Sequence, residues 1–252
     1  GWKGIFIVLL ILGVLLLFSN LHFKESLSVD NRKRGNLKSL VSSFGIVLKN
    51  RRYVYYVLQM GFAMGVLFAN ISSSPFIVQQ HYGFSAFEFS LFFGINALAI
   101  GLAAGLSVKF KNPEHAMFLG SVGMTIMSAV EFVILSNEYH FAVYEAVLFV
   151  LLFSMGLTFT ASTTLAMDCE RANSGTASAL FGAAGFAFGG IVSPLVGLGD
   201  ILSTTGLIFF VCSVCSLCFS VFAMNQTHTN LWGSFKCKMG PVARFVFLRR
   251  EK

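Results

Sequence analysis

Hydrophobic residues in this chain fall into long runs that short polar segments separate. Seven runs are long enough to cross a bilayer as a helix, which takes about 20 residues. None alternates with the period of two that a membrane-spanning strand needs, so the pattern predicts an all-α membrane protein with seven transmembrane helices. The predicted spans are Gly4 to Phe23, Tyr53 to Gln79, Phe87 to Val108, Ala116 to Leu135, Phe141 to Met167, Thr176 to Leu198 and Gly206 to Met224.

The composition fits lipid rather than water as the surrounding solvent. Hydrophobic residues make up 56% of the 252 residues and charged residues 12%, whereas soluble domains carry about 25% charge. The mean hydropathy is +0.76. Too little polar surface remains to cover a water-soluble globule, which excludes that class of protein.

The basic residues predict which ends of the spans face the cytoplasm. Seventeen of the 18 lysines and arginines lie on one side of the predicted spans, and only Lys3 lies on the other. Because short cytoplasmic loops are enriched in lysine and arginine, we expect a multi-pass protein of the cell inner (plasma) membrane with a cytoplasmic C-terminus. The net charge of +7 then reflects contact with anionic lipid and indicates no nucleic-acid partner.

These patterns divide the chain into four parts. One transmembrane helix covers residues 1–23, a basic cytoplasmic loop covers 24–52, a six-helix transport bundle covers 53–224 and a basic tail covers 225–252. We expect the loop to be either an amphipathic segment at the membrane surface or a linker between two bundles.

Small residues recur at four-residue spacing on three of the predicted spans. Such stripes let helix backbones approach closely in lipid, so we expect them to mark packing faces. Pro194 also predicts a kink, because proline removes a backbone donor from a helix. The glycines assigned to packing are Gly61, Gly65, Gly101, Gly105, Gly185, Gly189 and Gly197.

Polar side chains inside a membrane are costly, so they mark transport pathways or contacts between helices. On the second predicted span, Gln59, Asn70 and Ser74 share one stripe at about 100° per residue, and we expect them to contact a cargo. Pro75 follows directly and predicts a helix break or gate. Asn96 on the third span would either line the same cavity or bridge two helices. The apolar cargo contacts are assigned to Phe68, Phe149 and Phe153.

A proton-coupled carrier needs a carboxyl group that can gain and lose a proton within the membrane. Glu131, late in the fourth span, is the candidate. It lies near the outer end of its span, as Glu88 and Glu145 do, so the alternative for all three is an interfacial carboxylate in water.

Motifs of enzymes and of metal sites are missing from the sequence. It contains no zinc-protease, P-loop or serine-hydrolase pattern, and the five histidines are scattered. Cys212, Cys215 and Cys218 share one apolar run, where cysteine most often serves as a small apolar residue. We therefore expect no enzyme activity, no metal and no cofactor.

Three stretches carry a resemblance to a known family. Asn70 to Ala99 contains Ser74-Pro75-Phe76-Ile77, then Gly83 to Ser90 and Asn96, and it resembles the seventh and eighth helices of the bicyclomycin-resistance (Bcr/CflA) multidrug transporters of the major facilitator superfamily. Ala166-Met167 with Ser174 to Leu180 is similar to the approach to that family's eleventh helix. Gly1 to Phe6 is similar to the start of its sixth.

The resemblance implies a drug:proton antiporter in which two six-helix bundles enclose a cavity that opens alternately to each side. This chain would hold helices six to twelve, with small-molecule substrate, protons, the lipid bilayer and the missing N-terminal bundle as its partners. The family's first five helices, its signature loop and its usual proton-coupling carboxylate would lie in the absent part. We therefore expect a fragment or truncated product that does not transport alone.

Two alternative functions stay open at this point. The same fold could carry a different small metabolite or a sugar. The chain could also be a non-transporting membrane scaffold or receptor, with the basic loop or the tail as its binding segment.

Overall fold

Every regular element in the described part of the chain is a helix, as the computed structural model of residues 2–22 and 37–238 shows. Seven of these helices are long and apolar enough to span a membrane, which confirms the predicted all-α membrane fold. The elements are α1 (Trp2–Leu21), α2 (Leu37–Leu48), α3 (Arg51–Pro75), η2 (Phe76–His81), α4 (Ala86–Ser107), α5 (Pro113–Ser136), α6 (Phe141–Cys169), η3 (Arg171–Asn173), α7 (Ser174–Leu195), η4 (Val196–Leu198) and α8 (Ile201–Lys238).

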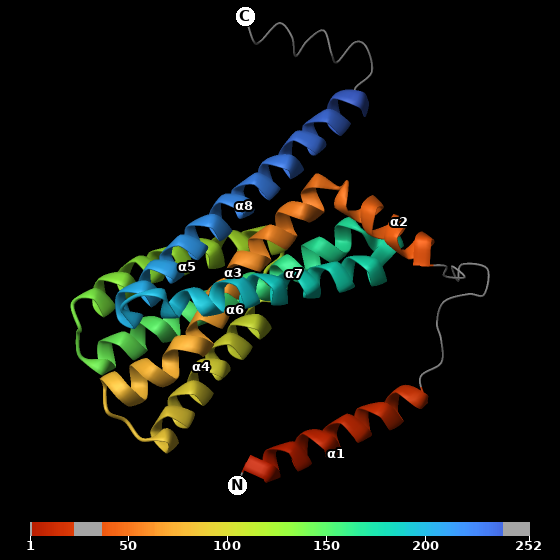
Figure 1. The fold of residues 1–252 in the computed structure, drawn as a ribbon. Helices are drawn as coiled ribbons and strands as arrows, with labels where there is room; N and C mark the ends of the chain where they lie inside the picture. Colours follow the sequence, from red (N-terminus) through yellow and green to blue (C-terminus); the bar gives the residue numbers. More distant parts are fainter. Residues whose placement is uncertain (1, 23–36, 239–252) are drawn as a thin grey trace, which may run out of the picture. The chain divides into compact units, whose positions relative to one another are not determined.

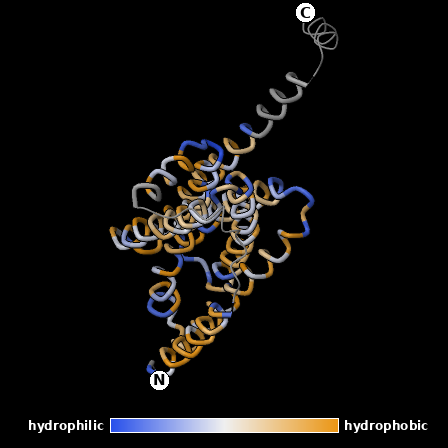
Figure 2. The backbone as a smooth tube through the Cα atoms, turned by 90° about the vertical axis from the view of Figure 1, so that its right-hand side faces the viewer, coloured by the Kyte–Doolittle hydropathy of each residue, from blue (hydrophilic) through white to orange (hydrophobic). Residues whose placement is uncertain are grey.

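The chain forms two compact units, residues Gly1–Leu40 and Val41–Lys252. In the first, the described side chains of α1 are all exposed. In the second, α3 packs against α6, α7 and α8, while α6 also packs against α4 and α5 (Figure 1). The strongly hydrophobic stretches lie along the helices (Figure 2). Two helices, α3 and α6, therefore form the centre of the bundle.

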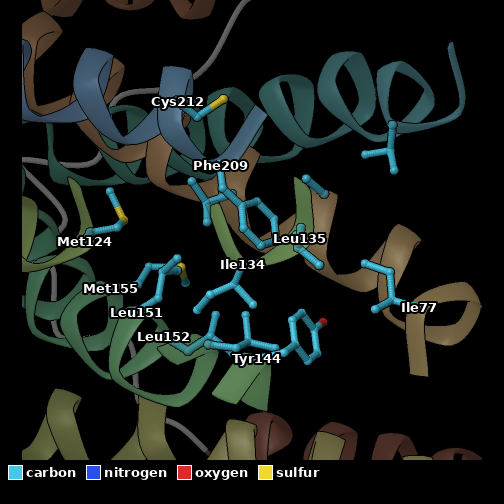
Figure 3. Packing of buried hydrophobic residues seen from close by; sticks show 14 of the residues in the cluster. Ile77, Met124, Ile134, Leu135, Tyr144, Leu151, Leu152, Met155, Phe209 and Cys212 are labelled. Carbon is cyan, nitrogen blue, oxygen red and sulfur yellow. The ribbon is translucent and has the colours of Figure 1, made fainter. Parts of the chain in front are cut away.

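Two clusters of buried hydrophobic residues hold the bundle together. One contains Tyr53, Tyr56 and Met60 at the start of α3. The other contains Tyr144, Leu151 and Phe209, and Figure 3 shows how side chains from α5, α6 and α8 meet in it. We call the end of the bundle where α4 joins α5 the Arg52 end, and the end where α5 joins α6 the Glu131 end.

Polar side chains fix where several helices begin. The Asn50 side chain accepts a hydrogen bond from the Tyr53 N–H at 3.3 Å and starts α3. Ser85 and Glu88 form a capping box at the start of α4, since each side chain accepts from the other residue's backbone N–H. Such caps satisfy N–H groups that the first helical turn leaves unpaired. Glu88 is thus exposed and engaged in a cap.

Helix extends into the predicted basic loop and the predicted tail. The loop contains α2, and α8 continues to Lys238, past the predicted end of the last span at Met224. Hydropathy reports which part of a helix suits lipid and does not report where the helix ends, because polar residues such as Asn225 and Gln226 are also compatible with a helix. The remaining parts of the loop and tail, residues 23–36 and 239–252, lie outside the described residues.

At both prolines the helix changes its type, while the predicted break at Pro75 and kink at Pro194 stay predictions. After Pro75 the helix continues as the π-helical turn η2, in which the Tyr82 N–H donates to the Ile77 carbonyl at 3.0 Å. Pro194 lies in the last turn of α7, which then tightens into η4. A wider π-helical turn thus follows Pro75 and a narrower 3-10 turn follows Pro194. A gating role for either proline stays a prediction.

Glycines on α3 and α7 leave space for large side chains of the opposite helix. Phe188 packs over Gly61, where a Cβ would lie 2.6 Å from the ring, and Phe68 packs over Gly189. Gly185 contacts Met64, and Gly65 contacts Val192 and Cys212. The two helices therefore fit together through small residues paired with large ones, as expected for close packing in lipid.

The remaining predicted packing glycines differ. Gly101, Gly105 and Gly197 have no heavy atom within 4 Å of a Cβ position in the described structure, so they form no packing face there. Instead, Gly156 lies against the backbone of α4, with the Ile100 carbonyl oxygen 2.5 Å from a Cβ position. We had not singled out Gly156, because it stands alone among larger residues rather than in a four-residue stripe.

Gly156→Ala should destabilise the bundle by about 1–3 kcal/mol, because the added methyl group would displace the α4 backbone. The matched control is Gly101→Ala, where the space is open and the gain in helix propensity should stabilise by about 0.5–1 kcal/mol. The thermal unfolding midpoints of the purified proteins test this. Equal midpoints for the two variants would contradict the packing described here.

Asp200 should make the stability depend on pH at the start of α8. The Ser203 backbone N–H donates to its carboxylate at 2.9 Å, and this bond lowers the pKa of Asp200 below the ordinary value. Because folding lowers the pKa, the stabilisation is complete above about pH 4 and is lost as pH falls through the lowered value.

Asp200→Ala should therefore cost about 1 kcal/mol near neutral pH, and its difference from the wild type should vanish in acid. Asp200→Asn keeps an acceptor oxygen and removes the titration, so its stability should lack this pH dependence. Melting curves across acidic pH measure both effects. A constant deficit for Asp200→Ala at every pH would contradict the capping role.

Candidate functional site

Gln59 is the centre of a hydrogen-bond network that joins four helices. Its amide nitrogen donates to Ser216 at 3.0 Å and to Ser121 at 3.4 Å, and its amide oxygen accepts from Ser162 at 2.5 Å. The Ser216 hydroxyl in turn donates to the Gln59 carbonyl at 3.1 Å. The Gln59 side chain is 0% exposed, so it connects α3 with α5, α6 and α8 rather than presenting its amide at an open surface.

The other polar residues of the predicted stripe lie nearer the Glu131 end. The Ser74 hydroxyl donates to the Asn70 carbonyl and side-chain oxygens, both at 2.7 Å, and both residues are buried. Ser73 makes the same kind of bond to the Ala69 carbonyl at 2.9 Å. Hydroxyls one turn along a helix commonly bond back in this way, so the polar atoms of this pair are satisfied within α3 just before η2.

Glu131 lies in the interior of the bundle without a partner. Its side chain is 0% exposed, and neither carboxylate oxygen has a hydrogen-bond partner among the described residues. The group is therefore not the interfacial carboxylate in water that we weighed as the alternative. A buried carboxylate with no donor is among the most costly arrangements in a protein interior.

Glu145 and Asn96 form a second polar pair close to Glu131. The Asn96 amide donates to a Glu145 carboxylate oxygen at 2.9 Å and joins α4 to α6. Asn96 thus bridges two helices, which was one of its two expected roles. Its own side-chain oxygen is buried and has no hydrogen-bond partner in the described structure, while the neighbouring buried Tyr144 hydroxyl interacts with Ser74.

The three predicted phenylalanines are neither buried nor fully exposed. Phe68 on α3 and Phe149 and Phe153 on α6 are all half-buried. Phe68 stacks edge-on against Phe186 of α7, with ring centroids 5.9 Å apart. The side chains of Gln59, Asn70 and Ser74 are buried, whereas part of each of these three rings is exposed at the surface of the bundle.

A charged cluster holds the Arg52 end together. The Arg52 guanidinium donates to Glu114 of α5 at 2.9 Å and to the Tyr56 hydroxyl at 3.2 Å. The Asn50 amide donates to Glu170 at the end of α6 at 2.7 Å. We did not predict this cluster, because its members are far apart in sequence and each stands at the polar end of a span.

No metal site is visible in the part of the chain that the structure describes. No three histidine, cysteine, aspartate or glutamate side chains come together there. Cys212 is buried and packs beside Gly65, while Cys218 on the same helix is exposed. The three cysteines of the apolar run thus point in different directions.

Comparison with known proteins gives two matches. Residues 1–194 match the model of the Major Facilitator Superfamily. The chain is also 36% identical over 218 residues to YdgK of Bacillus subtilis (strain 168), an uncharacterized MFS-type transporter, across 84% of this chain and 54% of the relative. The chain therefore spans about half the length of the curated relative that it matches.

Gln59→Leu should lower the stability of the bundle by about 1–2 kcal/mol, since it removes interhelical hydrogen bonds and leaves the buried Ser162 hydroxyl without its acceptor. Gln80→Leu, at an exposed position beyond Pro75, is the control and should have little effect. Thermal unfolding of the purified variants measures the difference. A Gln59→Leu protein that unfolds like the wild type but loses cargo binding would contradict the packing role and support the predicted cargo contact.

Proposed function

Because the chain belongs to the major facilitator superfamily and so is part of a membrane transporter, we propose that it forms the C-terminal part of a proton-coupled exporter of small amphipathic molecules. In this proposal the bundle moves as one body against an N-terminal bundle, and the space between them opens alternately to each side. The dense packing of α3 with α7 supports movement as a unit.

The observation that carries the proposal is the isolated carboxyl group of Glu131. A proton removes the cost of burying it, whereas loss of that proton requires a new partner or water. A change in protonation would therefore favour a different arrangement of the helices around it. This is the property that coupling between proton movement and conformational change requires.

The aromatic residues support an amphipathic cargo. Phe68, Phe149 and Phe153 are half-buried and offer ring surface for apolar groups. We propose Asn70, Ser74 and Asn96 as polar contacts, to which the cargo would gain access when the helices move. Gln59 acts through packing in this proposal, because its amide is already fully engaged.

The charges support an orientation in the plasma membrane. Lysine and arginine gather at the Arg52 end, at Arg51, Arg52, Lys109, Lys111 and Arg171, whereas the connections at the Glu131 end contain none. By the positive-inside rule the Arg52 end faces the cytoplasm, and the C-terminus of α8 lies on the same side.

Glu131→Gln in the full-length transporter should abolish efflux driven by a pH gradient and retain exchange of cargo down its own gradient, because a permanently neutral side chain removes coupling without removing the pathway. Glu88→Gln is the control, since Glu88 is an exposed helix cap at the same end. Transport into proteoliposomes, with and without an imposed pH gradient, measures both activities. Unchanged pH-driven efflux by Glu131→Gln would refute the assignment.

The same assay separates the proposed cargo from the alternative ones. Competition by amphipathic cations and dyes, and none by sugars, is the expected result. Competition by a sugar or a polar metabolite alone would assign the bundle to a different cargo on the same fold. No transport of any kind by the full-length protein would favour a scaffold or receptor.

A further inference from the structure

The short connection between α5 and α6 brings two glutamates to the same level of the bundle. Glu131 lies five residues before the end of α5 at Ser136, and Glu145 lies four residues after the start of α6 at Phe141. At a rise of about 1.5 Å per residue, antiparallel neighbours so placed stand opposite each other. The carboxyl groups are close enough for their charges to interact.

Oxygen atoms without partners gather around this pair. Both Glu131 carboxylate oxygens and the Asn96 side-chain oxygen are buried and have no hydrogen-bond partner in the described structure, while the buried Tyr144 hydroxyl interacts with Ser74. Asn96 is tied to Glu145 by its 2.9 Å hydrogen bond, and Tyr144 lies within electrostatic reach of Glu131 and Glu145. Helices α4, α5 and α6 thus contribute oxygen atoms to one place, and those of Asn96 and Glu131 are unpaired in the described structure.

The described surroundings contain no positive charge to balance the pair. Besides Glu145, the ionisable groups that face Glu131 are Tyr144 on α6 and Tyr82 after η2. On the α8 side, the backbone of Phe132 contacts Gly206, beside the buried hydroxyl of Thr205. The arginines of α3, Arg51 and Arg52, lie at the other end of the bundle, and Arg52 pairs with Glu114.

From this arrangement we propose that Glu131, Glu145, Asn96 and Tyr144 form a binding site for one small monovalent cation, either a proton shared by the two carboxyl groups or a sodium ion. Two carboxyl groups at close range do not ionise independently, so one charge between them must be balanced. Carboxylate, amide and hydroxyl oxygens are the ligands that hard cations take in proteins. Unpaired oxygens in a buried place suit such an ion and do not suit an anion.

The cation site depends on the proposed function in one respect only, namely that cation binding is coupled to transport. Cation binding itself needs no cargo and no N-terminal bundle, since all four side chains belong to Val41–Lys252. A failure of the transport proposal would therefore leave the cation site standing. A failure of the cation site would remove the proposed coupling at Glu131, while movement of cargo down its own gradient would still be measurable.

Labelling of the purified chain with dicyclohexylcarbodiimide tests the site directly. This reagent modifies carboxyl groups in apolar surroundings through their protonated form, and peptide mass spectrometry locates the product. We expect Glu131 to be labelled strongly and Glu88, exposed at the same end, to serve as the internal control. Titrations over pH, in sodium chloride or in N-methylglucamine chloride at equal ionic strength, distinguish the two cations.

Labelling of Glu131 that falls about tenfold per pH unit above its titration point, equally in both salts, identifies a proton. Protection by sodium at constant pH identifies a sodium ion. Glu145→Gln keeps an oxygen for the Asn96 bond and should move the pH at which Glu131 labelling falls, or abolish the protection by sodium. Labelling of Glu131 no greater than that of Glu88, or independent of both pH and sodium, would overturn the proposal.

Discussion

A polar group inside a lipid-embedded helix bundle must find its partner within the bundle, and the rest of this structure depends on that constraint. Gln59 satisfies it by binding hydroxyls from three other helices. Arg52 satisfies it with Glu114, and Asn96 with Glu145. Glu131 stands out because both oxygens of its buried carboxylate lack a partner among the described residues. Burying an ionisable group in this way costs more than burying an unpaired hydroxyl or amide oxygen, such as those of Thr205 and Asn96, and this cost is the physical basis for assigning Glu131 a function.

Close packing connects the surroundings of Glu131 with the rest of the bundle. The rings of Phe188 and Phe68 occupy the spaces left by Gly61 and Gly189, and α6 lies against the α4 backbone at Gly156. Helices that interlock in this way shift together rather than singly. A change of charge at Glu131 would therefore be felt along α5 and α6, and through Gln59 along α3 and α8. The packing thus connects one buried group with most of the bundle.

The sequence predicted the helices well and the environment of the polar residues less well. Span positions follow from hydropathy, because lipid selects long apolar runs. Hydropathy does not predict which side chains bind Gln59 and Asn96, because those partners come from helices up to 157 residues away in the chain. The stripe of Gln59, Asn70 and Ser74 correctly showed one polar face of α3, but a single helix cannot reveal whether such a face meets water or other helices.

Glu131 and the glycines illustrate the same limit. Position along the span suggested an interfacial carboxylate, yet the rotation of α5 turns Glu131 inward, and rotation depends on packing. The glycines of α3 and α7 contact side chains of the opposite helix, because the two helices pack against each other. Gly101 and Gly105 on α4 face no described partner. The resemblance to Bcr/CflA transporters predicted the superfamily correctly. It does not predict the cargo or the coupling ion, because these depend on individual side chains along the transport pathway.

The central claim is that the buried carboxyl group of Glu131 is neutralised inside the folded bundle. Infrared spectroscopy of the purified protein in sodium-free buffer near neutral pH measures this directly. The account predicts, for a bound proton, a carbonyl absorption of a protonated acid that Glu131→Gln removes and Glu88→Gln leaves in place; if sodium is the ion, carboxylate bands of Glu131 should change when sodium is added. Carboxylate bands of Glu131 that resemble those of a solvated side chain, unaffected by sodium, would contradict it.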